Sequence, residues 1–244
     1  ERDPRAVEKL GLIAQQLDDQ ANAKRLLELA AAGYRSAGDQ PSSATAAIRL
    51  THLTAPDTLS EHEGQVVPLL DVGPLALLRR YQAERDLDSH AYDRCQERGE
   101  EATALADQRG LLNIAKLARI IAARCASERG ELDTAIRLTG EAGDIVETQL
   151  RATTGDIARQ ELGFEAYRIY RLLFQLEAQR GGAGHVERAF LASERARARA
   201  HLEPLGVDAP SVVVELRLHA LERLEVLVAL GGQIGAARGA VDEG

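Results

Sequence analysis

The feature that most constrains this chain is the helical periodicity of its apolar residues, which runs through every long segment. The segment 156–180 shows it clearly, with apolar residues at steps of three and four: Leu162, Ala166, Ile169, Leu173 and Leu176. Side chains at such steps share one face of an α-helix. Runs of alternating Val, Ile and Thr, which are typical of strands, are absent. We therefore predict an all-α protein.

The composition indicates closely packed helices. Hydrophobic residues make up 45 % of the 244 residues, whereas aromatic residues make up only 3 %, so Ala, Leu, Val and Ile must fill the core. Short Gly-containing breaks separate the periodic segments, and a Gly after a helix supplies a left-handed cap. We expect helices over 4–17, 19–37, 41–54, 60–71, 74–86, 88–109, 111–129, 132–152, 156–180, 185–205 and 210–230.

Two of these helices, 111–129 and 156–180, are apolar over a wide arc. In 156–180 a second stripe, formed by Tyr167, Tyr170 and Phe174, lies beside the first. A helix of this kind needs neighbours on both sides, as in a solenoid, where each hairpin buries its apolar surface against the next. We therefore expect an α-α superhelix of stacked helical hairpins.

Small residues recur at fixed offsets after the Gly breaks. Gly130 is followed by Ala135, Thr139 and Ala142, and Gly184 by Ala189, Ser193 and Ala196. This pattern resembles tetratricopeptide (TPR) repeats, in which small residues mark the contacts between helices. The copies are less even and farther apart than in the usual repeat of about 34 residues, so the array is a degenerate one. A helical bundle without repeats is the alternative, because bundles use the same small residues.

The repeats are expected to occupy residues 1–206, with an irregular connector at 54–75 that contains Pro56, Pro68 and Pro74. Residues 207–244 are expected to form a C-terminal helix and a tail at the junction with a missing domain. The chain begins with Glu1 and contains no Met, so we expect a piece of a longer protein.

The stretch 189–200 reads A-F-L-A-S-E-R-A-R-A-R-A. It resembles the helix that closes the TPR array of many bacterial CHAT proteins, in which a caspase-like protease domain follows. The resemblance covers this helix closely and residues 88–206 loosely, and the sequence from His201 to Gly206 departs from the family. It implies a sensor or regulatory segment whose protease domain is not present in this chain. No catalytic residue of the family can be carried over.

Charge and hydropathy narrow the classes of partner. A net charge of −8 argues against nucleic acid, because phosphate binders concentrate Lys and Arg on one face. No apolar run is long enough for a transmembrane helix, and no signal peptide is apparent at the start. We therefore predict a cytoplasmic protein with a protein or peptide partner, and without contact to nucleic acid or membrane. The sequence does not indicate the oligomeric state.

We find no catalytic residues and no cofactor or metal motif in the sequence. Cys95 and Cys125 lie on apolar helical stripes, where a buried thiol has a raised pKa and is inert, so we interpret both as core residues. Glu215, His219 and Glu222 share a helical face, but a metal site in a bundle needs further sets on facing helices. P-loop, G-x-S-x-G and Rossmann motifs are absent.

The candidate binding residues are polar side chains of the C-terminal half, namely Arg168, Arg171, Gln175, Arg188, Arg195 and Arg199. The first three interrupt the apolar stripes of 156–180. The last three align on one helical face, beside the small residues of 189–200. They form either a site for an anion or an acidic peptide, or ion pairs with acidic residues of a neighbouring helix.

Together these features predict a non-catalytic protein-interaction scaffold within a larger CHAT-type protein. Two alternatives remain. A TPR segment of a transcriptional regulator or of a signalling ATPase would be flanked by a DNA-binding or an NTPase domain. A helical-bundle enzyme would need a buried cluster of carboxylates and histidines, and the sequence shows none.

Overall fold

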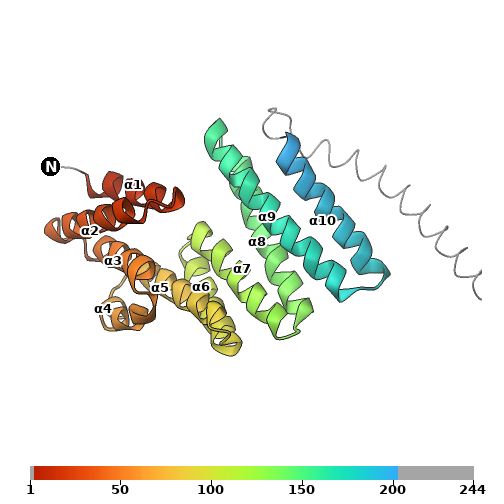
Figure 1. Ribbon diagram of the computed structural model, residues 1–244, viewed down its shortest axis with the longest axis horizontal. Helices are drawn as coiled ribbons and strands as arrows, with labels where there is room; N and C mark the ends of the chain where they lie inside the picture. Colours follow the sequence, from red (N-terminus) through yellow and green to blue (C-terminus); the bar gives the residue numbers. More distant parts are fainter. Residues whose placement is uncertain (1–2, 203–244) are drawn as a thin grey trace, which may run out of the picture. The chain divides into compact units, whose positions relative to one another are not determined.

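The computed structural model describes residues 3–202, apart from the side chains of residues 156, 157 and 198–202. This part of the chain forms ten α-helices and one short 3₁₀ helix and contains no strand (Figure 1). The predicted all-α class is confirmed. The helix expected over 210–230 and the predicted C-terminal region 207–244 lie outside the described residues.

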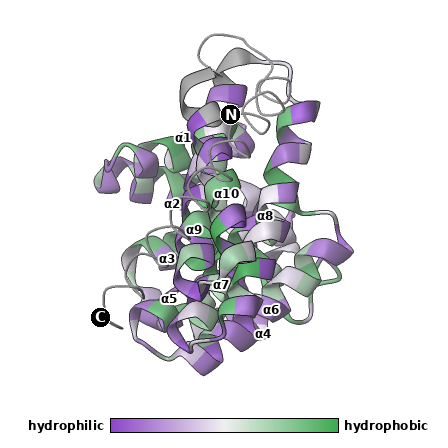
Figure 2. Cartoon of the chain, turned by 90° about the vertical axis from the view of Figure 1, so that its right-hand side faces the viewer, coloured by the Kyte–Doolittle hydropathy of each residue, from purple (hydrophilic) through white to green (hydrophobic). Residues whose placement is uncertain are grey.

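Most helices agree with their predicted ranges to within a few residues. Their bounds are α1 Pro4–Gln16, α2 Gln20–Ser36, α3 Gln40–Thr54, α5 Gly73–Asp88, α6 Tyr92–Gln108, α7 Leu112–Glu128, α8 Leu132–Ala152, α9 Asp156–Arg180 and α10 Ala183–Leu202. The visible helices carry both hydrophobic and hydrophilic residues (Figure 2), as the periodicity of the sequence predicts.

The helix predicted over 60–71 is wrong. The chain instead forms a 3₁₀ helix, η1 (Pro56–His62), and a single turn, α4 (Glu63–Val66). Pro68 has no N–H group and therefore cannot continue the hydrogen-bond ladder of α4. The expectation of an irregular connector between residues 54 and 75 describes this region better than the predicted helix does.

The turns between consecutive helices share one geometry. In five of them a residue with positive φ follows the helix, and the next N–H group donates to the carbonyl five residues before it, at 2.8 to 3.0 Å. This is the Schellman motif, which satisfies the last carbonyl groups of a helix. The residues with positive φ are Asp18, Gly38, His90, Gly110 and Gly130.

These turns recur at a constant interval. The step along the chain from Asp18 to Gly38 equals the steps from His90 to Gly110 and from Gly110 to Gly130. A hairpin consists of two such steps and is longer than a TPR unit, which takes about 34 residues. Over residues 18–130 the array is therefore a regular repeat of its own length, interrupted by η1 and α4. The spacing is not kept after Gly130, since the next residue with positive φ is Gly181.

Small residues mark the contacts between helices at fixed places in this repeat. The fifth residue after each turn is Ala or another small residue, and it is buried in every copy: Ala23, Ser43, Cys95, Ala115 and Ala135. The predicted contact residues Ala135, Thr139 and Ala142 are fully buried, and Ala189 and Ala196 are at most 5 % exposed. The interpretation of these five as packing residues is confirmed, whereas the predicted contact residue Ser193 is only half-buried.

Contacts divide the chain into two compact units, Glu1–Ile145 and Val146–Gly244, and the boundary falls inside α8. In the first unit Arg119 of α7 joins its two neighbours, because it is 2.7 Å from Asp107 of α6 and 3.0 Å from Glu141 of α8. In the second unit α10 folds back on α9 after a turn at Gly181 and Gly182, both with positive φ.

Candidate protein-binding surface

One side of α9 is exposed along much of its length and combines aromatic with polar side chains. Phe164 is 58 % exposed and Phe174 is 39 % exposed. Between and beside them Arg168, Arg171 and Gln175 are exposed as well. Successive residues of this set are one to four positions apart, so they lie on the same side of the helix. We call these five residues the α9 strip.

The two arginines of the α9 strip, Arg168 and Arg171, have no ionic partner among the side chains that the structure describes. Arg119 of the first unit shows the contrast, since it is only 12 % exposed and is paired with two carboxylates. An exposed guanidinium without a partner retains all five N–H donors for a ligand. The α9 strip is therefore a cationic surface in a protein whose net charge is −8.

Arg188 of α10 does not belong to such a free surface. Its Nε donates to Oε1 of Glu177 on α9 at 2.9 Å, and Nδ1 of His185 lies 2.5 Å from the other oxygen of the same carboxylate. Glu177 is only 2 % exposed, and removing one partner from a buried ion pair is destabilising. For Arg188 the ion-pair interpretation of the sequence is therefore correct.

Arg195 also turns toward α9. Its guanidinium carbon lies 5.7 Å from the ring centre of the buried Tyr170, which is within the range of a cation–π contact. The hydroxyl group of Tyr170 donates to Oε1 of Glu147 at 2.8 Å. Arg199 lies in α10, but its side chain is outside the described residues.

Five of the six candidate residues thus fall into two groups, and the side chain of the sixth, Arg199, is not described. Arg168, Arg171 and Gln175 belong to the exposed α9 strip, whereas Arg188 and Arg195 lie against residues of α9. Sequence reasoning missed the exposure of the aromatic residues, since it placed Phe174 in a buried stripe beside Tyr170. Phe174 lies between the polar residues Arg171 and Gln175, and this pattern could have indicated in the sequence that Phe174 is exposed.

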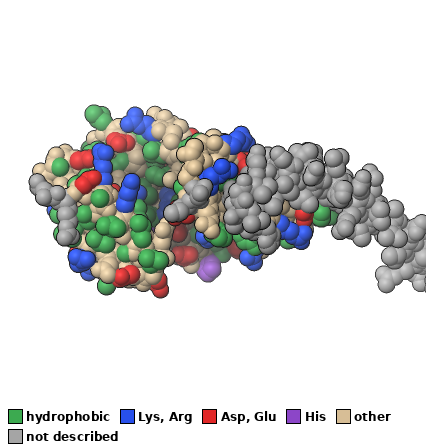
Figure 3. Space-filling view, turned by 90° about the horizontal axis from the view of Figure 1, so that it is seen from above, with side chains coloured by type: hydrophobic (Ala, Val, Ile, Leu, Met, Phe, Trp, Pro, Cys, Tyr) green, Lys and Arg blue, Asp and Glu red, His purple; other side chains and the backbone are tan. Residues whose placement is uncertain are grey.

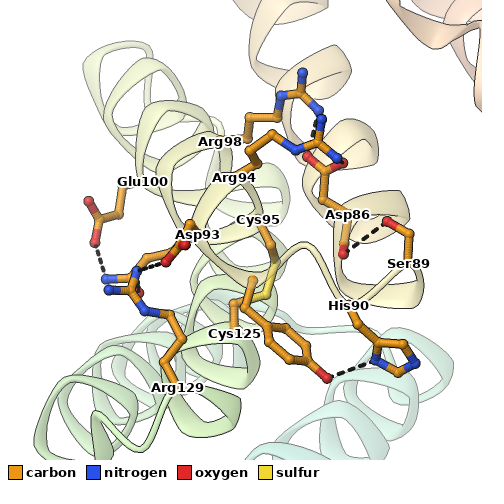
Figure 4. Close-up of a disulfide and its surroundings, with 12 residues drawn as sticks. Asp86, Ser89, His90, Asp93, Arg94, Cys95, Arg98, Glu100, Cys125 and Arg129 are labelled. Carbon is orange, nitrogen blue, oxygen red and sulfur yellow. Dashed lines mark hydrogen bonds and ion pairs between the residues drawn. A yellow bond between two sulfur atoms is a disulfide. The ribbon is translucent and has the colours of Figure 1, made fainter.

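The two cysteines are bonded to each other. Cys95 of α6 and Cys125 of α7 form a disulfide, with Cα atoms 6.1 Å apart, and both residues are fully buried (Figure 4). Their predicted burial is confirmed, but the interpretation as two inert thiols is wrong, because neither is free. The periodicity placed each cysteine on its own helix and carried no information about their pairing across the hairpin.

The surroundings of the disulfide are charged. Asp86 of α5 is fully buried, and Arg98 of α6 donates to its carboxylate at 2.5 Å (Figure 4). Arg85 adds a second contact at 3.3 Å. A buried carboxylate needs such partners, so this cluster holds α5 to α6 and is not a ligand site.

Other surfaces give weaker candidates. Leu10, Ile13 and Leu17 near α1 are exposed, and hydrophobic side chains gather over the N-terminal helices (Figure 3). Among the side chains that the structure describes, there is no group of three His, Cys, Asp or Glu residues that could hold a metal ion. No helix in the described part of the chain is long and apolar enough to cross a membrane.

Comparisons with known proteins add no relative: no family model matches the chain, nor does any curated protein or solved structure. The α9 strip and the repeat geometry are therefore the observations on which a function has to rest.

Proposed function

We propose that this chain is a non-catalytic protein-interaction scaffold, which binds a protein or peptide through the α9 strip. The observation that carries the proposal is the exposure of two phenylalanines next to two unpaired arginines on one helix face. Aromatic residues, Phe among them, and Arg are enriched at the buried core of protein interfaces relative to the rest of the surface. Helical repeats suit this role because their helices present rows of side chains to a partner.

The proposal extends to a regulatory role within a larger CHAT-type protein, with TPR-like repeats as the sensor. The resemblance of 189–200 to the closing helix of that family supports it. So does the packing of this helix, since Ala189, Ala192 and Ala196 are buried. The gene sequence around the chain tests this part: a caspase-like protease domain supports it, whereas a DNA-binding or NTPase domain favours a transcriptional regulator or a signalling ATPase.

A non-catalytic role is also consistent with the cysteines. A thiolate is the nucleophilic form of cysteine, and Cys95 and Cys125 are joined in a buried disulfide. Disulfides persist mainly in oxidising compartments, so the bond weighs against the cytoplasmic location expected from the sequence. Alkylation of the thiols in intact cells decides between the two: a free Cys95 and Cys125 would support the cytoplasm.

Site-directed photo-cross-linking tests the scaffold proposal. A photo-reactive amino acid replaces Gln175 in the full chain, and a matched one replaces Arg35, an exposed residue of α2. The cross-linked partner is identified, purified and titrated against the parent and against Phe164→Ala/Phe174→Ala. We expect cross-linking from position 175 only, and binding at least about tenfold weaker in the double variant. Equal affinities for parent and variant would refute the assignment of the surface.

A further inference from the structure

We infer that the ligand of the α9 strip is an acidic amphipathic helix, a segment that places carboxylates and apolar side chains on one face. This inference rests on the proposed function and adds the chemistry of the partner. Three properties of the strip carry it: its charge, the spacing of its aromatic residues and the state of its backbone.

The charge of the strip selects an anionic partner. Arg168 and Arg171 are exposed, and neither forms an ion pair with a side chain in the described part of the structure. Acidic neighbours on the same helix are Glu161, one turn before the strip, and Glu165, which already has an interaction within the chain. The part of the strip from Arg168 to Gln175 is therefore cationic. Carboxylates bind guanidinium groups with two parallel hydrogen bonds, which makes Asp and Glu the matching side chains.

The aromatic residues require an apolar component as well. Phe164 and Phe174 are ten positions apart, which corresponds to about 15 Å along the helix axis. Phe164 is 58 % exposed and Phe174 is 39 % exposed, so covering their rings with apolar side chains removes apolar surface from water and favours binding. A partner helix laid along α9 covers both rings with apolar residues about three turns apart and has its carboxylates between them.

The backbone of α9 decides between a helical and an extended partner. The strip lies inside a continuous helix of 25 residues, whose N–H and C=O groups are bonded within the helix. It has no free backbone edge to which an extended peptide can add as a strand. A helical partner satisfies its own backbone groups and contacts the strip through side chains alone. The structure of the strip therefore favours the helix.

A display selection tests the inference. The full chain is immobilised, and a random peptide library, long enough for at least three helical turns, is selected against it. We expect peptides with Asp or Glu one turn apart, flanked by apolar residues in helical register. A selected peptide, synthesised with a fluorescent label, should bind Arg168→Glu/Arg171→Glu at least about tenfold more weakly than the parent. Its affinity for Arg35→Glu, a matched change on exposed α2, should equal that for the parent.

The outcomes separate this inference from the proposed function. Selection of basic or uncharged peptides that still lose affinity in Phe164→Ala/Phe174→Ala would overturn the inference and leave the scaffold proposal intact. Acidic peptides that bind the double Arg variant as tightly as the parent would show that the strip is not their site, which also overturns it. A selection without any enrichment counts against both. Circular dichroism of each variant confirms that the chain remains folded.

Discussion

A Cβ atom placed on Gly99 of α6 would lie only 2.9 Å from the Cβ atom of Ala122 in α7. This is closer than two such atoms approach in real structures, so Gly99 is present because α6 and α7 touch at this point. Similar contacts recur along the array, because a small residue at the same position after each turn lets the next helix pack closely.

Gly99→Ala should therefore destabilise the protein by about 1–3 kcal/mol, because the added methyl group overpacks the contact with Ala122. This effect opposes the gain of up to about 1 kcal/mol that Ala gives in a helix interior. Gly140 of α8 is the matched control, since a Cβ atom there meets nothing within 4 Å. Urea unfolding should show Gly140→Ala at least as stable as the parent. If Gly99→Ala were stabilised to the same extent, the contact would not be tight.

Ala135→Leu and Ala196→Leu should each lower the free energy of unfolding by about 1–3 kcal/mol. Both alanines are buried, at 0 % and 5 % exposure, so a larger side chain displaces a neighbouring helix. Ala178→Leu, at an exposed position of α9, is the control and should change stability by less than about 0.5 kcal/mol. Thermal unfolding of the three variants measures the difference. Equal melting temperatures would mean that the two buried positions tolerate expansion.

Loss of the disulfide should cost about 2–4 kcal/mol, because Cys95 and Cys125 are 30 residues apart and their bond restricts the unfolded chain. A dithiol reductant should lower the melting temperature of the parent. The variant Cys95→Ala/Cys125→Ala should melt at the lower temperature with and without reductant. A reductant effect of equal size on this variant would have to come from something other than the disulfide.

Arg188→Ala should destabilise the hairpin of α9 and α10 by about 1–3 kcal/mol, because the buried carboxylate of Glu177 loses a charged hydrogen bond. His185 keeps its contact with the same carboxylate and limits the loss. The comparison is Arg171→Ala on the exposed α9 strip, which should change stability by less than about 0.5 kcal/mol. Chemical denaturation of both variants tests this; a similar small effect for both would place Arg188 among the dispensable surface charges.

His52 should make the protein less stable in mild acid. Burial, and next the nearby positive charge of Arg80, lower its pKa from 6.5 to about 4, and Asp88 opposes this shift. Between these two pKa values the unfolded chain binds a proton that the folded chain does not. Stability due to this group is therefore complete above about pH 6.5 and falls, by at most about 3 kcal/mol, as the pH falls toward 4.

The variant His52→Phe isolates the contribution of His52 to the pH dependence of stability. The imidazole of His52 stacks on Tyr81 at 3.8 Å between ring centres, and Glu84 lies 3.8 Å from its Nε2. His52→Phe keeps an aromatic ring against Tyr81 but removes the titrating group. Urea unfolding over this pH range should show a smaller loss of stability for the variant than for the parent. Parallel pH profiles would mean that His52 does not contribute.

The sequence alone determined the helices and their packing faces. Periodicity located every long helix of residues 3–202, and the small residues after the Gly breaks marked real helix contacts, as the burial of Ala135, Thr139 and Ala142 shows. Both signals are local, because the residues of one helix face are only three or four positions apart. Local signals failed over residues 60–71, where the chain forms the end of η1 and the single turn α4 before Pro68 in place of one helix.

Tertiary structure decided which residues meet. The disulfide joins two residues on different helices, and the ion pair between Arg188 and Glu177 crosses from α10 to α9. The same holds for exposure: Phe174 belongs to an apolar stripe by spacing, yet 39 % of its surface is open. Periodicity gives the direction in which each side chain leaves its own helix axis. Whether that side of the helix is buried depends on which other helix packs against it, and that helix comes from elsewhere in the chain.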